Sequence, residues 1–202
     1  MSKQLWKPGN MLYPVPVAMV SCKRPGEKPN IITIAWAGTI CSDPAMLSIS
    51  VRPTRYSHGI IRETREFVVN LTTEKLVRAA DLCGVKSGRS ADKFALTGLT
   101  AEPCAHLAAA PLIAESPVNI ECRVTEVKPL GSHDLFLAEV AGVHADERYL
   151  DQNGRFNINA AGLVVYSHGS YMALGRQLGT FGFSVRKKKS RPGSSAQNLR
   201  TS

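Results

Sequence analysis

The apolar residues of this chain gather in short, β-branched segments that Pro and Gly separate from one another. Such segments are typical of strands, and they occupy residues 15–22, 31–37, 46–51 and 67–71. Two longer apolar stretches, Val118–Val127 and Leu135–His144, flank a turn-rich link and predict a long antiparallel hairpin. The pattern therefore predicts a chain rich in β-structure.

One clear helical pattern follows the strand at 67–71. Apolar residues recur at helical spacing over residues 76–83, with Thr72 or Thr73 as the expected cap and Gly84 as the expected end. The chain shows no regular alternation of strands and helices, which argues against a doubly wound parallel sheet. The pattern favours a mainly β fold, a β-barrel with peripheral helices.

The basic charge of the chain belongs mainly to its C-terminal end. Residues 186–202 hold six Lys and Arg and no acid, and removing these six from the formal net charge of +9 leaves +3. Pro, Gly and Ser dominate the same stretch, a composition that cannot bury a core. We therefore expect one domain over residues 1–185 and a basic, disordered tail over residues 186–202. A nucleic-acid-binding barrel is an alternative, but basic runs are more often solvated ends, so no nucleic-acid partner is expected.

The remaining composition narrows the class of protein. Five cysteines without paired close spacing indicate reduced thiols and a cytoplasmic protein. The first ten residues lack the apolar stretch of a signal peptide, and no later run is long enough to span a membrane. The sequence contains no Gly-rich dinucleotide fingerprint, no phosphate loop and no metal-ligand spacing, so no metal site is expected.

Arginines and hydroxyl groups are concentrated in residues 50–58, where a strand gives way to a helix. Arginine binds phosphate oxygens through two parallel charge-assisted bonds, and Ser57 at a helix start would add its hydroxyl and unpaired amides. His58 could join them if it is protonated. The alternative is that Ser57 caps a helix over Gly59–Arg65 while the arginines face water.

Two further segments could complete a ligand site. In residues 30–38, small and hydroxyl residues alternate with large apolar ones, so a flat ring such as an isoalloxazine could lie against Thr33, Ala35 and Trp36. The alternative for Trp36 is a core aromatic. Residues 87–94 could close over the phosphate end of the ligand, or form an ordinary loop with Ser90 capping a short helix.

The order of these segments resembles a known family. Residues 30–36, 48–57, 67–70 and 84–94 are similar to the flavin-reductase-like FMN-binding split barrel family, and nearest to its flavoredoxin subgroup. The resemblance covers about residues 12–147, and two stretches within residues 166–182 also look like flavoredoxin-like members. It implies that the β-barrel is an FMN-binding split barrel.

The resemblance also implies a set of site residues. Flavin-ring contacts are expected from Thr33, Ala35 and Trp36, and phosphate contacts from Arg55 and Ser57. The implied cofactor-binding residues are Thr33, Ala35, Trp36, Ser50, Val51, Arg52, Arg55, Tyr56, Ser57, Asn70, Ser87, Gly88, Asp92 and Lys93. His144, which ends a long strand, is the candidate for steering nicotinamide or substrate.

For function, the resemblance implies an oxidoreductase in which NAD(P)H reduces FMN and electrons pass to free flavin, a ferric complex or another small acceptor. The alternative is a non-catalytic electron carrier, in which bound FMN serves a redox protein partner. The resemblance further implies a homodimer with the flavin near its interface. No acid-base pair is required, because the flavin itself carries the hydride chemistry.

Overall fold

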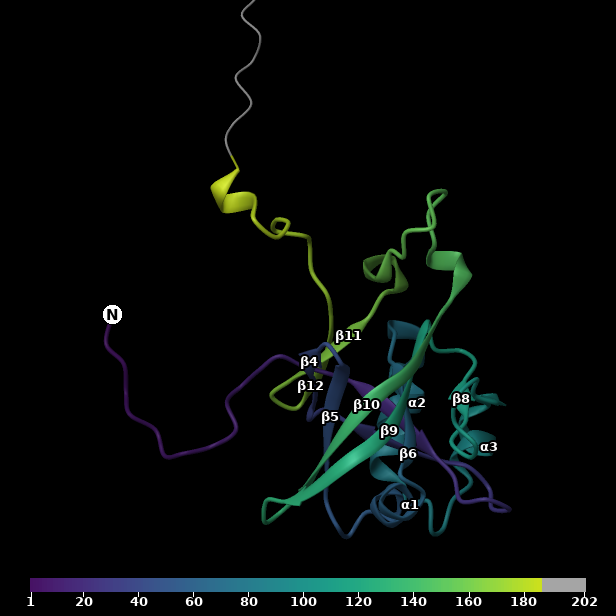
Figure 1. Ribbon diagram of the computed structural model, residues 1–202. Helices are drawn as coiled ribbons and strands as arrows, with labels where there is room; N and C mark the ends of the chain where they lie inside the picture. The colour runs from purple at the N-terminus through teal and green to yellow at the C-terminus, as the bar shows by residue number, and fades with distance from the viewer. Residues whose placement is uncertain (187–202) are drawn as a thin grey trace, which may run out of the picture.

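One antiparallel sheet of seven strands dominates the fold, in the order β3-β2-β6-β9-β10-β5-β4 (Figure 1). Its strands are β2 (Ala18–Cys22), β3 (Asn30–Ile34), β4 (Ala37–Ser42), β5 (Ala45–Val51), β6 (Glu66–Leu71), β9 (Val118–Pro129) and β10 (Asp134–Ala145). The computed structural model describes residues 1–186, so the predicted tail lies, apart from Arg186, outside the described residues. The predicted mainly β class is confirmed.

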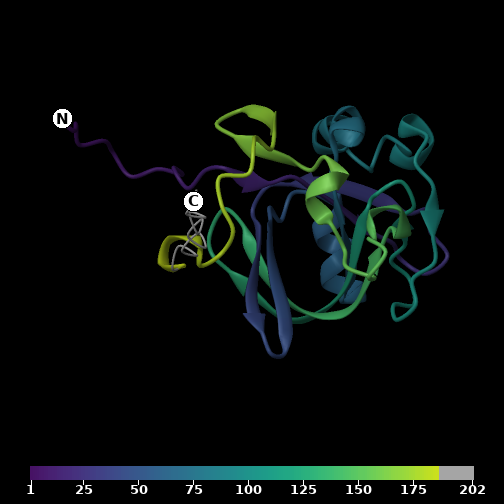
Figure 2. The ribbon, with the colours of Figure 1, turned by 90° about the horizontal axis from the view of Figure 1, so that it is seen from above.

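The sheet curls strongly but does not close (Figure 2). Its two edge strands, β3 and β4, are consecutive in the chain and are separated only by Ala35 and Trp36. They nevertheless stand at opposite ends of the hydrogen-bonded order, so the curled sheet remains split between them. The amide of Ser50 in β5 donates to the carbonyl of Trp36 at 2.9 Å, which holds the connecting turn against β5.

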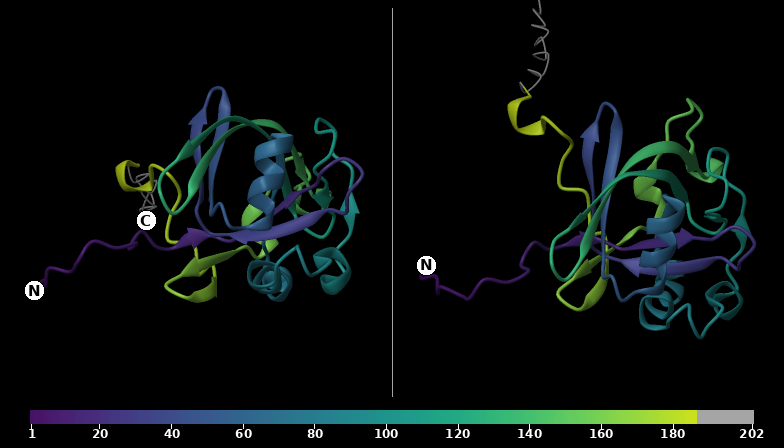
Figure 3. Two further views of the ribbon diagram at one scale, coloured as in Figure 1. Left: turned by 90° about the horizontal axis from the view of Figure 1, so that it is seen from below. Right: turned by 60° about the horizontal axis from the view of Figure 1, so that its bottom comes forward.

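Helix α1 (Tyr56–Thr64) lies within the curve of the sheet (Figure 3). Its Ile60 and Ile61 are buried in one core cluster with Phe67 of β6 and Phe136 of β10. The ring of buried His58 contacts Phe136 edge-on, and its Nε2 lies 2.8 Å from Asp134 Oδ2. Apolar packing and this buried polar contact together fix α1 to the start of β10.

A second layer covers the other face of β2 and β3. It contains η1 (Glu74–Leu76), α2 (Val77–Val85), α3 (Lys93–Thr97) and a three-stranded sheet of β1 (Val15–Pro16), β11 (Val164–Ser167) and β12 (Ser170–Ala173). Because β2 is covered on both faces, all five of its residues are buried, which explains its near-continuous apolar run. The remaining elements are the pair β7 (Ala101–Glu102) and β8 (Leu112–Ile113), and the short helices η2 (Glu147–Tyr149), η3 (Ile158–Ala161) and η4 (Phe183–Val185).

The predicted long hairpin is confirmed as β9 and β10, which pair antiparallel with two register shifts. The helix expected to end at Gly84 continues to Val85. Neither helix-capping expectation holds at the start of α1 or α3. Helix α1 begins at Tyr56, so Ser57 lies inside it, and α3 is capped by Asp92, whose Oδ1 accepts from the Ala95 amide at 3.1 Å. A side chain can cap a helix only from the residue that precedes its first turn. That residue is Arg55 for α1 and Asp92 for α3, whereas Ser57 and Ser90 were expected.

Two further findings concern the class of protein. Among residues 1–186, none of the helices combines the length and apolar character that crossing a bilayer requires. All five cysteines are free thiols in the structure.

Asn70 of β6 is a buried polar hub that joins the large sheet to β8. Its Nδ2 donates to the Met19 carbonyl at 2.8 Å and to Ser21 Oγ at 2.9 Å. Its Oδ1 accepts from the Ile113 amide at 3.0 Å and from Asn119 Nδ2 at 2.7 Å. The side chain is fully buried and its polar atoms are satisfied by protein partners, so Asn70 serves the core.

Replacing Asn70 with leucine should therefore cost stability without affecting ligand binding. Asn70→Leu leaves the buried Ile113 amide without its acceptor, and each such orphaned group costs about 1–3 kcal/mol. We expect the free energy of unfolding, measured by urea denaturation, to fall by about 2–4 kcal/mol. Asn153→Leu, at an exposed loop position, is the control and should change it little. A loss of flavin affinity in folded Asn70→Leu protein would instead favour a ligand contact.

Candidate functional site

Two adjoining pockets open along the split in the sheet. The pocket lined by aromatic side chains has a volume of about 390 Å³, and the pocket lined by cationic side chains has a volume of about 440 Å³. They share Ile32 from β3, Arg52 and Arg55 from the turn after β5, and Gly84 from α2. The two pockets therefore form one elongated site with chemically different ends, which we name the aromatic pocket and the cationic pocket.

The cationic pocket concentrates positive charge. Five cationic side chains line it, and within the described part of the chain no carboxylate joins them. They are Arg52, Arg55, Lys86, Arg89 and Lys93. Like charges so close together repel one another, so the arrangement is suited to an anionic ligand that neutralises several of them.

Lys93 is the most buried of these cations, with 3% of its surface exposed. Its Nζ donates to the carbonyl of Ile31 at 2.5 Å and to the carbonyl of Cys83 at 2.7 Å. Burial lowers the pKa of this ammonium group, and the nearby charge of Arg55 lowers it further. An ammonium carries three donors, so one remains for a ligand in the pocket.

The start of α1 forms the floor of the cationic pocket. Arg55 is the residue before the first turn of α1, and buried Ser57 accepts a hydrogen bond from Asn30 Nδ2 at 2.7 Å. The unpaired amides of a helix start attract anions, and no acidic side chain occupies the first turn. The suggestion that His58 joins the phosphate grip is wrong for this structure, because its Nε2 is paired with Asp134.

The loop of residues 87–89 closes the cationic pocket from the opposite side. Arg89 Nη1 donates to the carbonyl of Thr54 at 3.3 Å, which ties this loop to the turn before α1. Gly88 packs so closely that a Cβ there would collide with the side-chain amide of Asn30 and lie 2.6 Å from Tyr56 Cδ1. Only glycine fits this approach without movement of its neighbours.

The aromatic pocket has Trp36 and His133 on one wall. Their ring centroids lie 4.5 Å apart, and Trp36 remains 39% exposed at the pocket rim. Burial, together with the charge of Arg52, lowers the pKa of His133, so its imidazole is neutral at pH 7. The hydroxyl of Thr33, which also lines this pocket, donates to the Ala80 carbonyl at 2.6 Å, which leaves its oxygen as an acceptor.

Tyrosines from the three-stranded sheet and its approach form the other wall. Tyr166 lies 6.3 Å from Tyr13 and 5.7 Å from Tyr171, measured between ring centroids. The Tyr171 hydroxyl donates to Asp81 Oδ1 at 3.1 Å. Burial and the adjacent Asp81 carboxylate raise the pKa of Tyr171 to about 12, so it stays a neutral donor. Sequence reasoning missed this wall, because its members come from two segments at opposite ends of the domain's sequence.

Cys83 also lines the cationic pocket, and its chemistry is restrained by burial. Burial raises the pKa of its thiol to about 11, and the nearby Lys93 ammonium only partly opposes this. A neutral thiol is a poor nucleophile, so Cys83 acts as a small apolar wall residue at pH 7.

The structure brings together all but two of the implied cofactor-binding residues. The expected residues that line the two pockets are Thr33, Ala35, Trp36, Ser50, Val51, Arg52, Arg55, Tyr56, Ser57, Ser87, Gly88 and Lys93. Asn70 lies in the core, and Asp92 caps α3 and pairs with Lys28 at 3.1 Å, so neither lines a pocket. Asp92 adjoins the pocket residue Lys93 in sequence, whereas no pocket residue lies near Asn70 in the chain.

His144 also lies away from both pockets. Its Nε2 lies 2.5 Å from Oε1 of Glu121, a fully buried carboxylate that also accepts from the amides of Ala105 and His106. Burial alone would raise the pKa of Glu121, but these three hydrogen bonds outweigh it and hold the pKa below its usual value. Within this chain, His144 therefore positions a structural carboxylate.

The lowered pKa of Glu121 links stability to pH. A carboxyl group whose pKa is lowered by folding stabilises the protein above its unfolded pKa, and this contribution disappears as pH falls through the folded pKa. Glu121→Gln should therefore lower the free energy of unfolding by about 1–3 kcal/mol at pH 7, with a smaller deficit as the pH falls below about 4. Urea denaturation at both pH values measures the difference. Glu126→Gln, an exposed position on the same strand, should show no such pH dependence.

The chain is similar to known proteins in both sequence and fold. A family model described as "Flavin reductase like domain" matches residues 10–175. Flavoredoxin of Desulfovibrio vulgaris (Miyazaki F) superposes with a TM-score of 0.84 at 32% identity, covering 92% of this chain and 100% of that one. The NADPH-flavin oxidoreductase of Streptomyces viridifaciens is 30% identical over 63% of this chain and 64% of its own length.

A third relative is the reductase component of a monooxygenase. The reductase component of the 4-nitrophenol 4-monooxygenase/4-nitrocatechol 2-monooxygenase of Rhodococcus opacus is 29% identical over 56% of this chain and 57% of its own length. The family match covers most of the chain, and the flavoredoxin likeness extends over nearly all of it. The chain therefore belongs to the flavin reductase-like family of split-barrel proteins.

Proposed function

We propose that this protein binds FMN in the joined pockets and uses NAD(P)H to reduce it, passing the electrons to a small acceptor. The observation that carries the proposal is the pairing of a carboxylate-free cationic pocket with an aromatic pocket of similar size. A flavin mononucleotide has the matching halves, a flat aromatic ring and a phosphate. Membership of the flavin reductase-like family supports the same ligand.

The cationic pocket fits a phosphate monoester in three ways. Arg55 can offer a two-pronged guanidinium, α1 offers unpaired amides near Ser57, and Lys93 has a third N–H donor. A bound dianion would also relieve the repulsion among the cations. The pocket therefore gains most from a ligand that carries concentrated negative charge.

The aromatic pocket fits a flat ring system. Trp36 and His133 bound one side, and the tyrosine wall bounds the other. The apolar side chains of Ile32, Val17 and Val51 also line it. A ligand with an apolar ring and polar edges would find both kinds of contact here.

When bound, the flavin would supply the hydride and electron chemistry. The contribution of the chain is to hold the ring, exclude water from one side and set the local electrostatics. Arg52 lines both pockets, so its positive charge favours a ligand that gains negative charge. The Tyr171 hydroxyl donates its proton to Asp81, so its oxygen can accept a hydrogen bond from a ligand, and neutral His133 can donate or accept one.

A second candidate function is a non-catalytic electron carrier that serves a redox protein. The near-complete structural likeness to a flavoredoxin favours it, as does the exposure of Trp36 at the rim of the aromatic pocket. The reductase component from Rhodococcus opacus offers a parallel for a partner oxygenase. The two candidates share the FMN site and differ in whether NAD(P)H reacts rapidly.

We further propose that two copies form a homodimer and that the protein works in the cytoplasm. The homodimer follows from the family resemblance. The free thiols are suited to a reducing compartment.

Arg55→Ala tests the phosphate role directly. Loss of a charge-assisted contact of about 1.5–3 kcal/mol should weaken FMN binding by about 10- to 100-fold, measured by fluorescence titration. Riboflavin lacks the phosphate, so its affinity should change little. Arg62→Ala removes an exposed arginine from the same helix and is the matched control. An unchanged FMN affinity in Arg55→Ala would refute the role of this residue.

Anaerobic mixing of the FMN-loaded protein with NADH or NADPH separates the two functions. A reductase should lose its visible flavin absorbance within seconds with at least one of them. Slow or absent bleaching with both, in protein that dithionite bleaches fully, would exclude the reductase and leave the carrier. The released flavin should be identified as FMN in the same preparation.

A further inference from the structure

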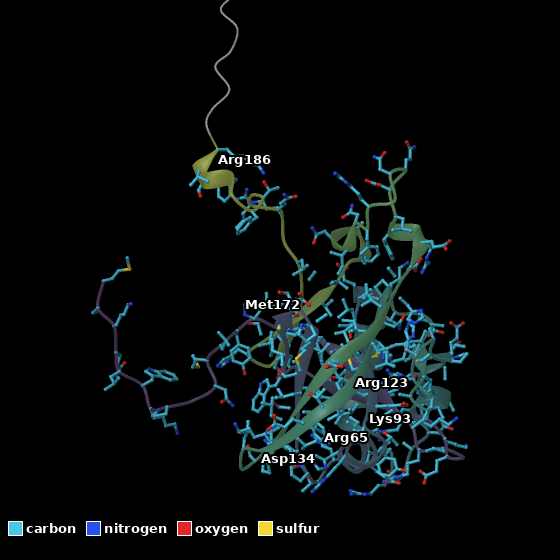
Figure 4. The ribbon with its side chains drawn as sticks, viewed as in Figure 1. Arg65, Lys93, Arg123, Asp134, Met172 and Arg186 are labelled. Carbon is cyan, nitrogen blue, oxygen red and sulfur yellow. The ribbon has the colours of Figure 1, made fainter. Side chains whose placement is uncertain are left out.

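Two extended arms project from the domain without packing on it (Figure 4). The N-terminal arm is residues 1–12, and the C-terminal arm is residues 174–186. Every residue of the N-terminal arm is exposed, and so is every residue of the C-terminal arm except Gly182. Segments that make so few contacts are usually polar, because water is then their main neighbour.

These arms are instead rich in large apolar side chains. Trp6 is 74% exposed, Leu12 is 88% exposed, and Phe181 is fully exposed. The complete set is Met1, Leu5, Trp6, Met11, Leu12, Leu174, Leu178, Phe181, Phe183 and Val185. A concentration of exposed apolar groups on this scale marks a surface that another molecule covers.

The tip of the C-terminal arm has its own local structure. The Phe183 amide donates to the Thr180 carbonyl at 2.9 Å, and Gln177 Nε2 donates to the Gly179 carbonyl at 3.2 Å. The ring of Phe183 lies so close to Gly179 that a Cβ there would be 2.6 Å from Phe183 Cδ1. A folded tip that presents Phe181 outward is preformed for docking, which reduces the entropy lost on binding.

The two arms start from one sheet. The N-terminal arm leads into β1 and the C-terminal arm leaves β12, and these strands flank β11. Exposed Met172 of β12 lies beside the point where the arms leave the domain (Figure 4). An almost wholly apolar groove of about 210 Å³, lined by Val15, Val165 and Leu174 among others, lies at the same place.

This placement favours a second copy of the same chain as the occupant. In a two-fold symmetric pair, any segment that crosses the axis is matched by the equivalent segment crossing back. Both arms leave the domain at residues that line or adjoin the apolar groove, so in such a pair each copy supplies both the apolar side chains and the apolar groove. A heterologous partner would need to match two arms and a groove at once.

The apolar surface is sufficient for such a pair. Trp6, Phe181 and Phe183 each offer roughly 150–250 Å² of side chain. With the aliphatic residues of both arms, the total reaches the approximately 800 Å² per partner that stable complexes bury.

We propose that both arms cross to a second copy of this chain and that docking of the N-terminal arm holds Tyr13 in the aromatic pocket. This rests on the homodimer of the proposed function. Tyr13 directly follows the N-terminal arm, lines the aromatic pocket and contacts the rings of Tyr166 and His168. Each copy thus completes the flavin pocket of its partner by anchoring the segment that ends at Tyr13.

Photo-crosslinking tests the exchange of arms. Phe181 is replaced by p-benzoylphenylalanine in an equal mixture of unlabelled and ¹⁵N-labelled chains that were unfolded and refolded together. Crosslinked peptides that join the two labels are expected. The same group at Leu96, an exposed position on α3, should give none. Crosslinks confined to one label, or wild-type protein that sediments as a monomer, would overturn the proposal.

Arm variants test the link to the pocket. Leu178→Ser with Phe181→Ser, and Trp6→Ser with Leu12→Ser, should each raise the dissociation constant of the dimer at least tenfold by sedimentation. Leu96→Ser removes an exposed apolar side chain outside the arms and should leave the dissociation constant unchanged. The N-terminal variant should also weaken riboflavin binding several-fold, whereas Arg55→Ala affects only FMN. An undisturbed dimer in both arm variants would refute the exchange, and undisturbed riboflavin binding in the N-terminal variant would refute the role of Tyr13.

These outcomes are separable from those for the proposed function. A monomer that binds FMN would refute the arm exchange and leave flavin binding intact. A dimer with crossed arms that binds no flavin would support the arm exchange and refute flavin binding.

Discussion

The burial of α1 within the curled sheet is the contact on which the site depends. Ile60 and Ile61 pack against Phe67 and Phe136, and the same helix presents its N-terminal turn to the cationic pocket. The apolar core therefore determines where the unpaired amides at the start of α1 lie. The contact between His58 and Asp134 also fixes the orientation of α1, because this buried polar pair is satisfied in one orientation only.

The clustering of cations around the pocket has an electrostatic cost. The chain places several cations around one pocket and buries one of them, Lys93, beneath the surface. Backbone carbonyls of Ile31 and Cys83 satisfy part of its hydrogen-bonding capacity but supply no full negative charge. Burial of a charge without a counter-charge is unfavourable, so an anionic ligand in this pocket would offset part of that cost.

How well sequence reasoning worked depended on the range of the interactions. The strands and the long hairpin were predictable because alternation and turn residues are local signals. Most pocket residues on β3 and the turn before α1 were also placed together, since they lie close in sequence. Asn70 and His144 lie outside both pockets, which could not be read from the sequence because their partners, Ile113 and Glu121, are distant in the chain. The tyrosine wall escaped notice for the same reason, as Tyr13 and Tyr166 meet only in the folded protein.

The split between β3 and β4 has a consequence for how such sites diversify. The chain spans the opening with Ala35 and Trp36 alone, and the core on either side is complete without them. Lengthening or shortening this bridge by one residue would alter the width and shape of the ligand opening while the two edge strands kept their existing partners. The scaffold thus separates the residues that maintain the fold from the short linker that borders the aromatic pocket, so that the linker can change without rebuilding the core.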